Sequence, residues 1–299
     1  MAKSKFTINQ FREMYPDDDA CLHKIFQLRF TGLVCPKCES TKEFTRVKNR
    51  RSYQCPCCSY QIYPTKDTVF EKCRVPLIHW FYAIFLQTTT RNGVSAKELE
   101  RMLSICYTTA LRMNHQIKKL IANTKAKKGS LGKIAGTVQI DEVYLGQSLV
   151  TMSHKQRAKI KADDLTKFDN KTGVMGFVSD KGEVRFEVMT DNKTFKERVK
   201  NNVAKESIIV TDSHAGYEGL SLHYKQHEVV NHSIREFKKG KYHTNNIESA
   251  WALLRRTIYG THISVSPQYL QLYVDEVAFR LMQKDKQDTM FEIILSHVV

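Results

Sequence analysis

The sequence predicts an α+β protein with more than one domain, and three observations support this class. Two cysteine pairs fall within residues 35–58, helical patterns fill residues 76–122, and strands alternate with helices after residue 137. A chain of 299 residues is long enough for two or three domains. We expect an N-terminal helix with a cysteine module at 1–72, a helical segment at 73–122, a linker at 123–136, an α/β core at 137–282 and a C-terminal tail at 283–299.

The cysteines near the start of the chain predict a metal site. Cys35 and Cys38 form one C-x2-C pair, and Cys55 and Cys58 form a second pair sixteen residues later. This spacing is typical of a structural zinc site, because each two-residue spacer lets one tight turn point two thiolates at the same ion. Cys57 stays open as an alternative to Cys58. We therefore expect one structural Zn²⁺ in a zinc ribbon. The other cysteines are expected to be buried free thiols: Cys21, Cys73 and Cys106.

Positive charge is concentrated in the N-terminal part of the chain. The formal net charge is +16. Residues 1–134 contain 24 Lys and Arg against 10 Asp and Glu, whereas residues 135–299 contain 23 against 21. This distribution is typical of a segment that binds a polyanion such as DNA. Excess lysine that only aids solubility is the alternative.

Basic residues also lie in the turn between the two cysteine pairs. Strand-like residues flank this turn within the segment 42–55, as a zinc ribbon requires. We expect the basic side chains to contact DNA phosphates, and a solvated turn is the alternative. The residues concerned are Arg46, Lys48, Arg50 and Arg51.

The helical segment 73–122 has the pattern of a helix-turn-helix. Pro76 suits the start of its first helix. Ser95 and Glu98 form a capping-box pattern that opens a second helix ending near Met102. A three-residue turn then leads to a longer helix over 107–121, as in DNA-binding helix-turn-helix proteins, although a plain helical connector gives the same pattern. The candidates on or near the recognition face are Thr108, Thr109, Arg112, His115, Gln116 and Lys119.

Two carboxylates follow expected strands of the α/β core. The strands 137–140 and 207–211 end at Asp141 and Asp212. Adjacent strand ends can bring these side chains close together, and their repulsion would then require cations. Two Mg²⁺ (or Mn²⁺) ions held in this way activate an attacking oxygen and stabilise the leaving oxygen in phosphoryl transfer. The alternative for each aspartate is a loop cap. A hairpin is expected from strands at 173–179 and 183–189.

A third carboxylate, Glu248, lies at the edge of the buried stripe of a helix, and Arg255 follows seven residues later on the same face. Two explanations of Glu248 stay open. It is a metal ligand, or it completes a capping box that begins at Asn245. Glu142 is a weaker ligand candidate, because neighbouring residues of a strand point to opposite faces.

Motifs along most of the chain resemble those of the DDE transposases of a zinc-ribbon group of bacterial insertion sequences, to which eukaryotic Merlin transposases are related. The similarity runs from about residue 15 to residue 282, over CPKC…CPCC, GVSAKELERML, DEVYLG, TDSHAGY, HTNNIES and YGTHISVS…YLQLYVDEVAFR. The resemblance implies an RNase H-like core over 137–282 with Asp141, Asp212 and Glu248 as metal ligands and Arg255 near a DNA phosphate. Because some members have asparagine as the third ligand, Asn245 stays open.

The function implied by this resemblance is DNA transposition. The protein would bind the ends of its own mobile element, free a 3′-hydroxyl by water attack, and join this hydroxyl to a target strand as a homo-oligomer that pairs both ends. Gln147 and Met282 stand where glycine and asparagine are expected in the family, which leaves open whether this copy is active. For the basic segment 155–171, DNA contact and a disordered loop both stay open.

Two alternative functions stay open, and the sequence also predicts where in the cell the protein is found. A non-catalytic, domesticated DNA-binding regulator and an RNase H-like nuclease without strand transfer are the alternatives, and the presence of all three acids argues against the regulator. The longest apolar run, 75–86, is too short to span a bilayer, and no apolar segment follows Met1. We therefore expect no membrane partner and an intracellular protein, in the cytoplasm and nucleoid of a bacterium or the nucleus of a eukaryote.

Overall fold

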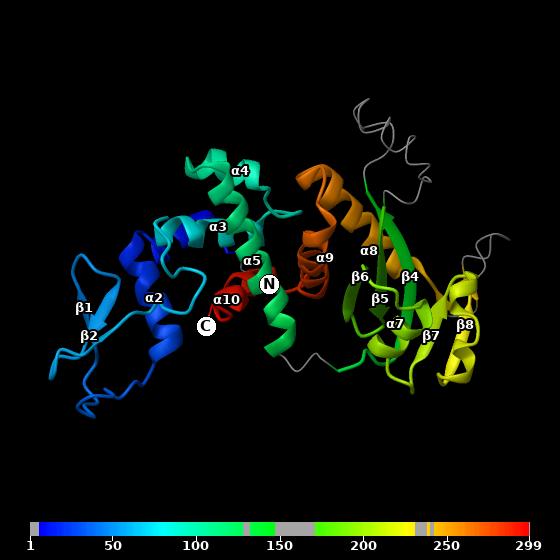
Figure 1. Ribbon diagram of the computed structural model, residues 1–299, viewed down its shortest axis with the longest axis horizontal. Coiled ribbons are helices and arrows are strands. Elements are labelled where there is room, and N and C mark those ends of the chain that lie inside the picture. The colour runs from blue at the N-terminus through cyan, green and yellow to red at the C-terminus, as the bar shows by residue number, and fades with distance from the viewer. Residues whose placement is uncertain (1–5, 128–131, 147–170, 231–237, 240–241, 299) are drawn as a thin grey trace. The chain divides into compact units, whose positions relative to one another are not determined.

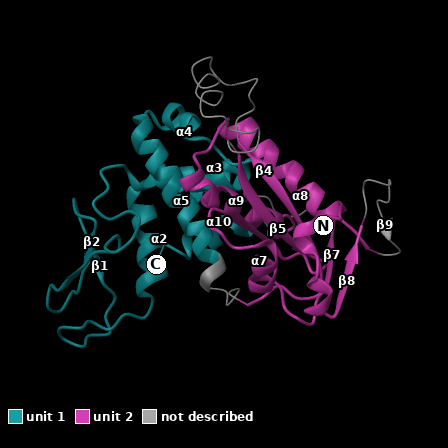
Figure 2. Cartoon of the chain, turned by 45° about the vertical axis from the view of Figure 1, so that its right-hand side comes forward, with its two compact units in different colours: residues 1–124, 286–299 teal, residues 125–285 magenta. Residues whose placement is uncertain are grey.

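The computed structural model describes residues 6–127, 132–146, 171–230, 238–239 and 242–298 (Figure 1). The chain divides into two units (Figure 2). Unit 1 combines residues 1–124 with residues 286–299, and unit 2 comprises residues 125–285. The α+β class predicted from the sequence is confirmed, because unit 1 is largely helical whereas unit 2 is built on a mixed sheet.

Unit 1 begins with two capped helices, α1 (Ile8–Met14) and α2 (Asp18–Phe30). Thr7 Oγ1 accepts a hydrogen bond of 3.3 Å from the N–H of Gln10, and Asp17 Oδ1 accepts one of 2.8 Å from the N–H of Ala20. These side chains replace partners that the first turn of a helix lacks. The zinc ribbon follows as an antiparallel sheet of β1 (Thr45–Val47), β2 (Ser52–Gln54) and β3 (Gln61–Ile62).

Three further helices of unit 1 form the predicted helix-turn-helix-like segment: α3 (Leu77–Thr89), α4 (Ala96–Leu103) and α5 (Tyr107–Lys127). The capping box at the start of α4 is confirmed, since Ser95 Oγ accepts from the N–H of Glu98 at 3.2 Å and Glu98 Oε2 accepts from the N–H of Ser95 at 2.7 Å. Ser104 ends α4 with a φ of +52°, and this left-handed residue turns the chain toward α5.

The structure differs from the predicted domain boundaries in the linker and in the C-terminal tail. Residues 123–127 continue α5 instead of starting a linker, because lysine and alanine are good helix formers. Ile134, also expected in the linker, is 3% exposed and packs in the core of unit 2. At the other end, α10 (Met290–Leu295) lies within the expected tail, yet Phe291 is 1% exposed and packs against Phe81 with 6.2 Å between ring centroids.

Unit 2 is built on a five-stranded sheet with the order β6-β5-β4-β7-β8. The strands are β4 (Thr137–Leu145), β5 (Thr172–Ser179), β6 (Val184–Met189), β7 (Ile208–Thr211) and β8 (Gln226–Val229). The first three are antiparallel neighbours, whereas β7 and β8 run parallel to β4. This arrangement is the RNase H-like topology that the family resemblance implied.

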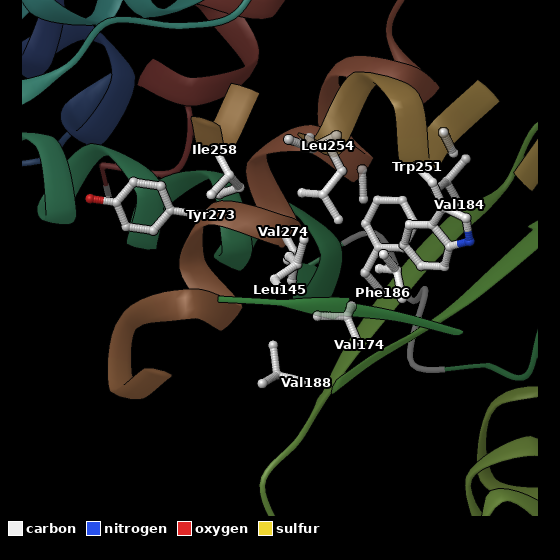
Figure 3. Close-up of a cluster of buried hydrophobic side chains, with 14 of the residues drawn as sticks. Leu145, Val174, Val184, Phe186, Val188, Trp251, Leu254, Ile258, Tyr273 and Val274 are labelled. Atoms are coloured by element: carbon white, nitrogen blue, oxygen red, sulfur yellow. The ribbon is translucent and has the colours of Figure 1, made fainter. Parts of the chain in front are cut away.

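The two faces of the sheet pack against different helices. On β4, Val138 and Ile140 join a core with α7 (Phe195–Asn202), whereas Val143 and Leu145 join a core with α8 (Asn245–Arg256) and α9 (Pro267–Met282). Figure 3 shows the second core around Trp251 and Phe186. Because successive residues of a strand point to opposite faces, Gln139 and Asp141 lie on the α8 face and Glu142 on the α7 face. The remaining elements of unit 2 are Ala215–Tyr217, Leu220–Leu222, Lys238–Lys239, Tyr242–His243 and the π-helix Thr257–His262.

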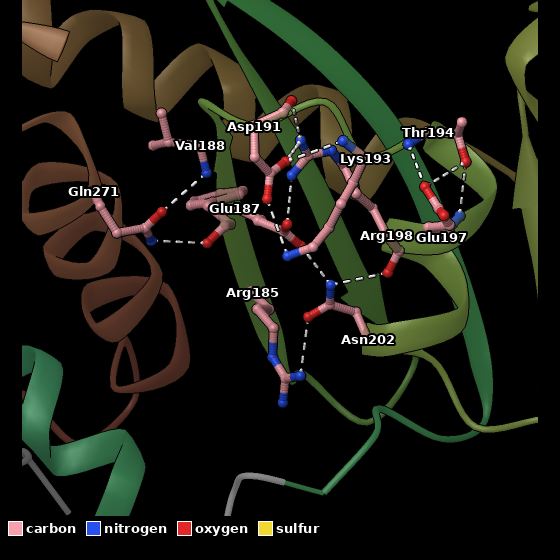
Figure 4. A network of polar contacts seen from close by, with 11 residues as sticks. Arg185, Glu187, Val188, Asp191, Lys193, Thr194, Glu197, Arg198, Asn202 and Gln271 are labelled. Carbon is pink, nitrogen blue, oxygen red and sulfur yellow. Dashed lines mark hydrogen bonds and ion pairs between the residues drawn. The ribbon is translucent and has the colours of Figure 1, made fainter. Parts of the chain in front are cut away.

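Polar contacts tie α7 and α9 to the edge strand β6 (Figure 4). Arg198 is 1% exposed, and its Nη1 donates to Glu187 Oε1 at 2.5 Å while its Nη2 contacts Asp191. The amide side chain of Gln271 accepts from the N–H of Val188 at 2.9 Å and donates to the carbonyl of Phe186 at 3.0 Å. Gln271 thus occupies the hydrogen-bonding positions of β6 that another strand would otherwise use.

Candidate functional site

Four cysteine thiols gather in unit 1 and form the first candidate site. The sulfur atoms of Cys35, Cys38, Cys55 and Cys58 all lie within 4.8 Å of one another. The Sγ–Sγ distances are 3.6 Å both for Cys35 to Cys58 and for Cys38 to Cys55. A tetrahedral site with Zn–S bonds of about 2.3 Å has sulfur–sulfur edges of about 3.8 Å. The thiols therefore fit a structural Zn²⁺, and the choice of Cys58 over Cys57 is confirmed.

Two turns with the same geometry hold these thiols. In the first, the N–H of Cys35 donates to Ser40 and the N–H of Glu39 donates to Cys35, both at 2.9 Å. In the second, the N–H of Cys55 donates to Tyr60 and that of Ser59 to Cys55, again at 2.9 Å. Glu39 and Ser59, each four residues after the first cysteine of its pair, have φ values of +54° and +59°. The C-x2-C spacing therefore produces the same turn twice.

The other cysteines lie outside this cluster. Cys57 is exposed, with its Sγ 3.3 Å from Ser40 Oγ. Cys21 is buried as predicted and Cys73 is half-buried, but the prediction of a buried Cys106 is wrong, because its thiol is exposed just before α5. There its sulfur contacts Thr109 Oγ1 at 3.0 Å, as a residue at the start of a helix can do. Hydrogen bonds from Thr108 and Thr109 lower the pKa of Cys106 to about 7.

The basic residues of the zinc ribbon divide into two groups. Arg46 contacts Asp19 at 2.7 Å and also the backbone carbonyls of Val47 and Arg50. Arg51 contacts Asp18 at 3.2 Å and the carbonyls of Cys73 and Val75. Both guanidinium groups thus hold the ribbon to other parts of unit 1, whereas Lys48 and Arg50 are exposed.

The predicted recognition face lies on α5. Buried residues Met113, Ile117 and Leu120 mark the inner side of this helix. Thr108, Arg112 and Lys119 are exposed, whereas Thr109, His115 and Gln116 are half-buried at the edge of the face.

The second candidate site is the edge of the sheet where β7 stops pairing with β4. The last paired residues of these parallel strands are Gln139 and Val210. Asp141 and Asp212 each follow two residues later, so both lie just beyond this edge, and both are half-buried. The predicted strand 137–140 was too short, because β4 continues to Leu145 along β5. Asp141 therefore lies inside β4. At its position β4 is still paired with β5 on one edge, whereas the pairing with β7 on the other edge has ended.

Asp141 lies within electrostatic range of the other two acids. Burial raises the pKa of Asp141, the indole of Trp251 and the N–H of Glu142 lower it, and the charges of Asp212 and Glu248 raise it. A cation stabilises the charged form of a carboxylate whose pKa is raised by neighbouring negative charges. Carboxylate oxygens are also the ligands that Mg²⁺ prefers, so the donor set fits this ion. Within the described residues, however, no group of three acids brings its ligand oxygens within 4.8 Å of one another.

Glu248 is exposed on the first turn of α8, and the capping-box explanation of this residue is wrong. Asn245 is the first helical residue rather than the cap. Instead, Gln139 Oε1 accepts from the N–H groups of Asn246 at 3.0 Å and Ile247 at 3.1 Å. The cap thus comes from β4, about one hundred residues earlier. Glu248 Oε1 accepts a local bond of 2.8 Å from Thr244 Oγ1, and Asn245 and Arg255 are exposed on the same helix.

Further residues around the acids were not predicted from the sequence. Trp251 Nε1 donates to Asp141 Oδ2 at 2.8 Å. On the opposite face of β4, Tyr217 Oη donates to Glu142 Oε2 at 2.6 Å, and the N–H of His214 donates to Asp212 Oδ1 at 3.0 Å. Burial raises the pKa of Glu142, and the bond from Tyr217 lowers it. The contacts of Trp251 and Tyr217 join residues far apart in sequence, so no local pattern reveals them, whereas the bond from His214 to Asp212 is local. Gln147 and residues 155–170 lie outside the described part of the chain.

A zinc ribbon, a helix-turn-helix-like segment and an RNase H-like sheet with two aspartates and a glutamate on the adjacent helix α8 define the class of DDE transposases. Residues 133–281 match the ISXO2-like transposase domain, and residues 16–61 match the transposase zinc-ribbon domain. The chain belongs to the ISXO2-like transposases of insertion sequences.

A protein of Halobacterium salinarum, described as an uncharacterized protein in transposable element ISH50, is 27% identical over 270 residues. The aligned region covers 86% of this chain and 88% of the relative. In the ranges that the structure describes, none of the helices is long and apolar enough to cross a membrane.

Proposed function

We propose that the protein is a DNA transposase that binds the ends of its own mobile element and catalyses metal-dependent strand cleavage and strand transfer. The observation that carries this proposal is the position of Asp141, Asp212 and Glu248 around one open edge of the RNase H-like sheet. Asp141 and Asp212 lie at matching positions beyond the last β4–β7 pair, and α8 brings Glu248 into electrostatic range of Asp141.

In this proposal the three carboxylates hold two Mg²⁺ or Mn²⁺ ions. When bound, the ions supply activation of the attacking oxygen and charge stabilisation of the leaving oxygen. Asn245 is the alternative third ligand, since it is exposed one turn before Glu248 on the same helix. Water attack at each element end would release a 3′-hydroxyl, and this hydroxyl would attack the target strand.

DNA contacts are proposed for exposed basic and polar residues on three elements. Lys48 and Arg50 lie on the ribbon turn, Thr108, Arg112 and Lys119 on α5, and Arg255 on α8. Arg46 and Arg51 are weaker candidates than the sequence suggested, because their guanidinium groups already bind carboxylates and carbonyls within unit 1. Pairing of two element ends would require a homo-oligomer.

The test is strand cleavage and joining on DNA that carries the flanking ends of the gene, with wild type beside Asp212→Asn. We expect joined products only with wild type and Mg²⁺, and unchanged zinc content and end binding in the variant. Loss of end binding in the variant would contradict the separation of binding from catalysis. Tight binding without cleavage by wild type would instead support a domesticated regulator.

A further inference from the structure

We propose that Trp251 is a positioning residue that fixes the carboxylate of Asp141 for metal binding, and that Gly176 provides the space for its ring. This inference rests on the proposed function, because it takes Asp141 as a metal ligand. It assigns a role in the site to a residue that its place in the sequence marks only as part of the hydrophobic core.

The hydrogen bond engages one of the two carboxylate oxygens. Trp251 Nε1 lies 2.8 Å from Asp141 Oδ2. Nε1–H is the only donor of an indole, so Trp251 holds this carboxylate through Oδ2 alone. A carboxylate held by one bond cannot rotate freely about its χ2 angle, and a ligand fixed in advance loses less entropy when an ion binds.

The ring of Trp251 is itself held firmly. It is 3% exposed and stacks on Phe186 with 5.0 Å between ring centroids and an interplanar angle of 27° (Figure 3). Its neighbours in this core include Ile247 and Leu254 from the same helix. The donor therefore has a fixed position, unlike a donor on an exposed side chain.

Gly176 explains how so large a ring fits over the sheet. It is the residue of β5 directly opposite Asp141. A Cβ atom on Gly176 would lie 2.5 Å from Cη2 and 2.6 Å from Cζ2 of Trp251, and 3.2 Å from Cδ1 of Ile247. Two of these distances are far below van der Waals contact. Any side chain at this position would therefore displace the ring from its place beside Asp141.

Trp251 also sets the spacing between two proposed ligands. It lies three residues after Glu248, so one helix carries both Glu248 and the group that holds Asp141. Movement of α8 would shift both at once. A buried indole N–H needs an acceptor in any protein core, and this structural requirement alone would explain the bond without any role in metal binding. The experiment must separate these two roles.

The first measurement uses the full-length protein labelled with ¹⁵N at the indole nitrogen. The chain contains two tryptophans, and Trp80 donates to Cys73 Sγ in unit 1. Trp80→Phe therefore identifies the Trp251 signal. We expect added Mg²⁺, without DNA, to shift the Trp251 signal in a saturable way and leave the Trp80 signal in place. Asp212→Asn should weaken this response.

The second measurement removes only the hydrogen bond. In the Trp80→Phe protein, incorporation of β-(3-benzothienyl)alanine replaces the N–H of Trp251 by sulfur and preserves the ring shape. We expect an unchanged circular dichroism spectrum and Mg²⁺ affinity about 10-fold weaker by calorimetry, as for other residues that orient ligands. Half-maximal cleavage should need correspondingly more Mg²⁺, with the maximal rate largely recovered at saturation.

Two outcomes would overturn the inference in distinguishable ways. If wild type binds Mg²⁺ and cleaves DNA, but the Trp251 signal stays fixed and the sulfur analogue has normal Mg²⁺ affinity, the bond serves packing alone. If wild type shows neither Asp212-dependent Mg²⁺ binding nor cleavage, the proposed function fails, and this inference fails with it.

Discussion

Asp141 is a residue whose exposure depends on the length of a neighbouring strand. It lies within β4, which is paired to β5 on both sides of this position, and only the end of β7 opens the other edge. The sequence marked the residue as a candidate ligand but ended its strand too early, because two consecutive acids resemble the end of a strand. Strand pairing supplied by residues 172–179 outweighs that local signal.

At the same scale, Glu248→Gln tests the third ligand. We expect cleavage to fall by more than about 100-fold, beyond the loss typical of residues that only orient a ligand, because a neutral amide is a poor Mg²⁺ ligand. Stability should stay within about 0.5 kcal/mol, since the position is exposed and the glutamine side chain can still accept the bond from Thr244. Cleavage assays and urea unfolding give the two results.

Asn245→Ala is the companion variant for this prediction. Its side chain is exposed and does not cap α8, so its loss should leave cleavage within a few fold of wild type. Normal cleavage by Glu248→Gln together with loss of cleavage by Asn245→Ala would transfer the third-ligand role to the asparagine.

At the scale of elements, α8 depends on β4 for its first turn. Gln139 accepts two N–H groups that begin the helix, and its Nε2 lies 3.3 Å from His243 Nδ1. Gln139 is 7% exposed and lies two residues before Asp141 on the same face. The sheet therefore sets where α8 begins. The position of Glu248 along the helix axis relative to Asp141 is fixed in the same way.

Gln139→Ala should destabilise unit 2 by about 1–2 kcal/mol, as expected for the loss of a helix cap that leaves buried donors unpaired. Urea unfolding followed by Trp251 fluorescence in the Trp80→Phe protein measures this change. Gln226→Ala is the matched control, because Gln226 is exposed on β8 and its side chain donates to nearby Glu228. Equal stability of both variants would show that Gln139 does not carry the cap.

The zinc ribbon gives a second prediction at this scale. Cys38→Ser should remove the bound zinc and unfold the ribbon, because four thiolates are needed for a closed site and metal binding supplies much of the folding free energy of such modules. Cys57→Ser should retain the metal, since Cys57 lies outside the cluster. Zinc content by atomic absorption after gel filtration distinguishes the two, and zinc loss from Cys57→Ser would contradict the assignment.

The elements show how far sequence reasoning reached. The cysteine spacing, the Ser95 capping box and the strand–helix alternation are local patterns, and each of these predictions is confirmed. The cap of α8 and the partner of Asp141 depend on residues about one hundred positions away, so they could not be predicted from spacing. The roles of Asp212, Glu248 and Arg255 stay predictions, because neither spacing nor strand pairing shows what these side chains bind.

At the scale of the whole molecule, unit 1 is completed by residues 286–299 from the C-terminal end of the chain. Phe291 of α10 lies in an aromatic cluster with Phe11, Tyr15 and Phe81, at ring centroid distances of 5.6 to 6.2 Å. Lys24 of α2 forms an ion pair of 2.8 Å with Glu292. The expected tail is therefore part of the core of unit 1, which local composition alone did not indicate.

Phe291→Ala should destabilise unit 1 by about 3–5 kcal/mol, the range for truncation of a buried aromatic side chain. Each unit contains one of the two tryptophans, Trp80 and Trp251, so variants that retain a single tryptophan report on each unit separately. We expect an earlier unfolding transition from Trp80 and an unchanged one from Trp251. Ser296→Ala, at an exposed position, is the control, and equal shifts of both tryptophan signals would contradict the division into units.

The return of residues 286–299 to unit 1 also bears on the order in which a growing chain can fold. Ribosomes release the N-terminal part first, yet its aromatic core lacks Phe291 until the residues of unit 2 have been made. Unit 2, a continuous stretch from 125 to 285, can fold while synthesis proceeds. A polypeptide that stops before residue 291 would therefore contain the acidic residues without a finished unit 1. Interrupted translation would then produce few fragments able to compete for the DNA ends that we propose the full-length protein binds.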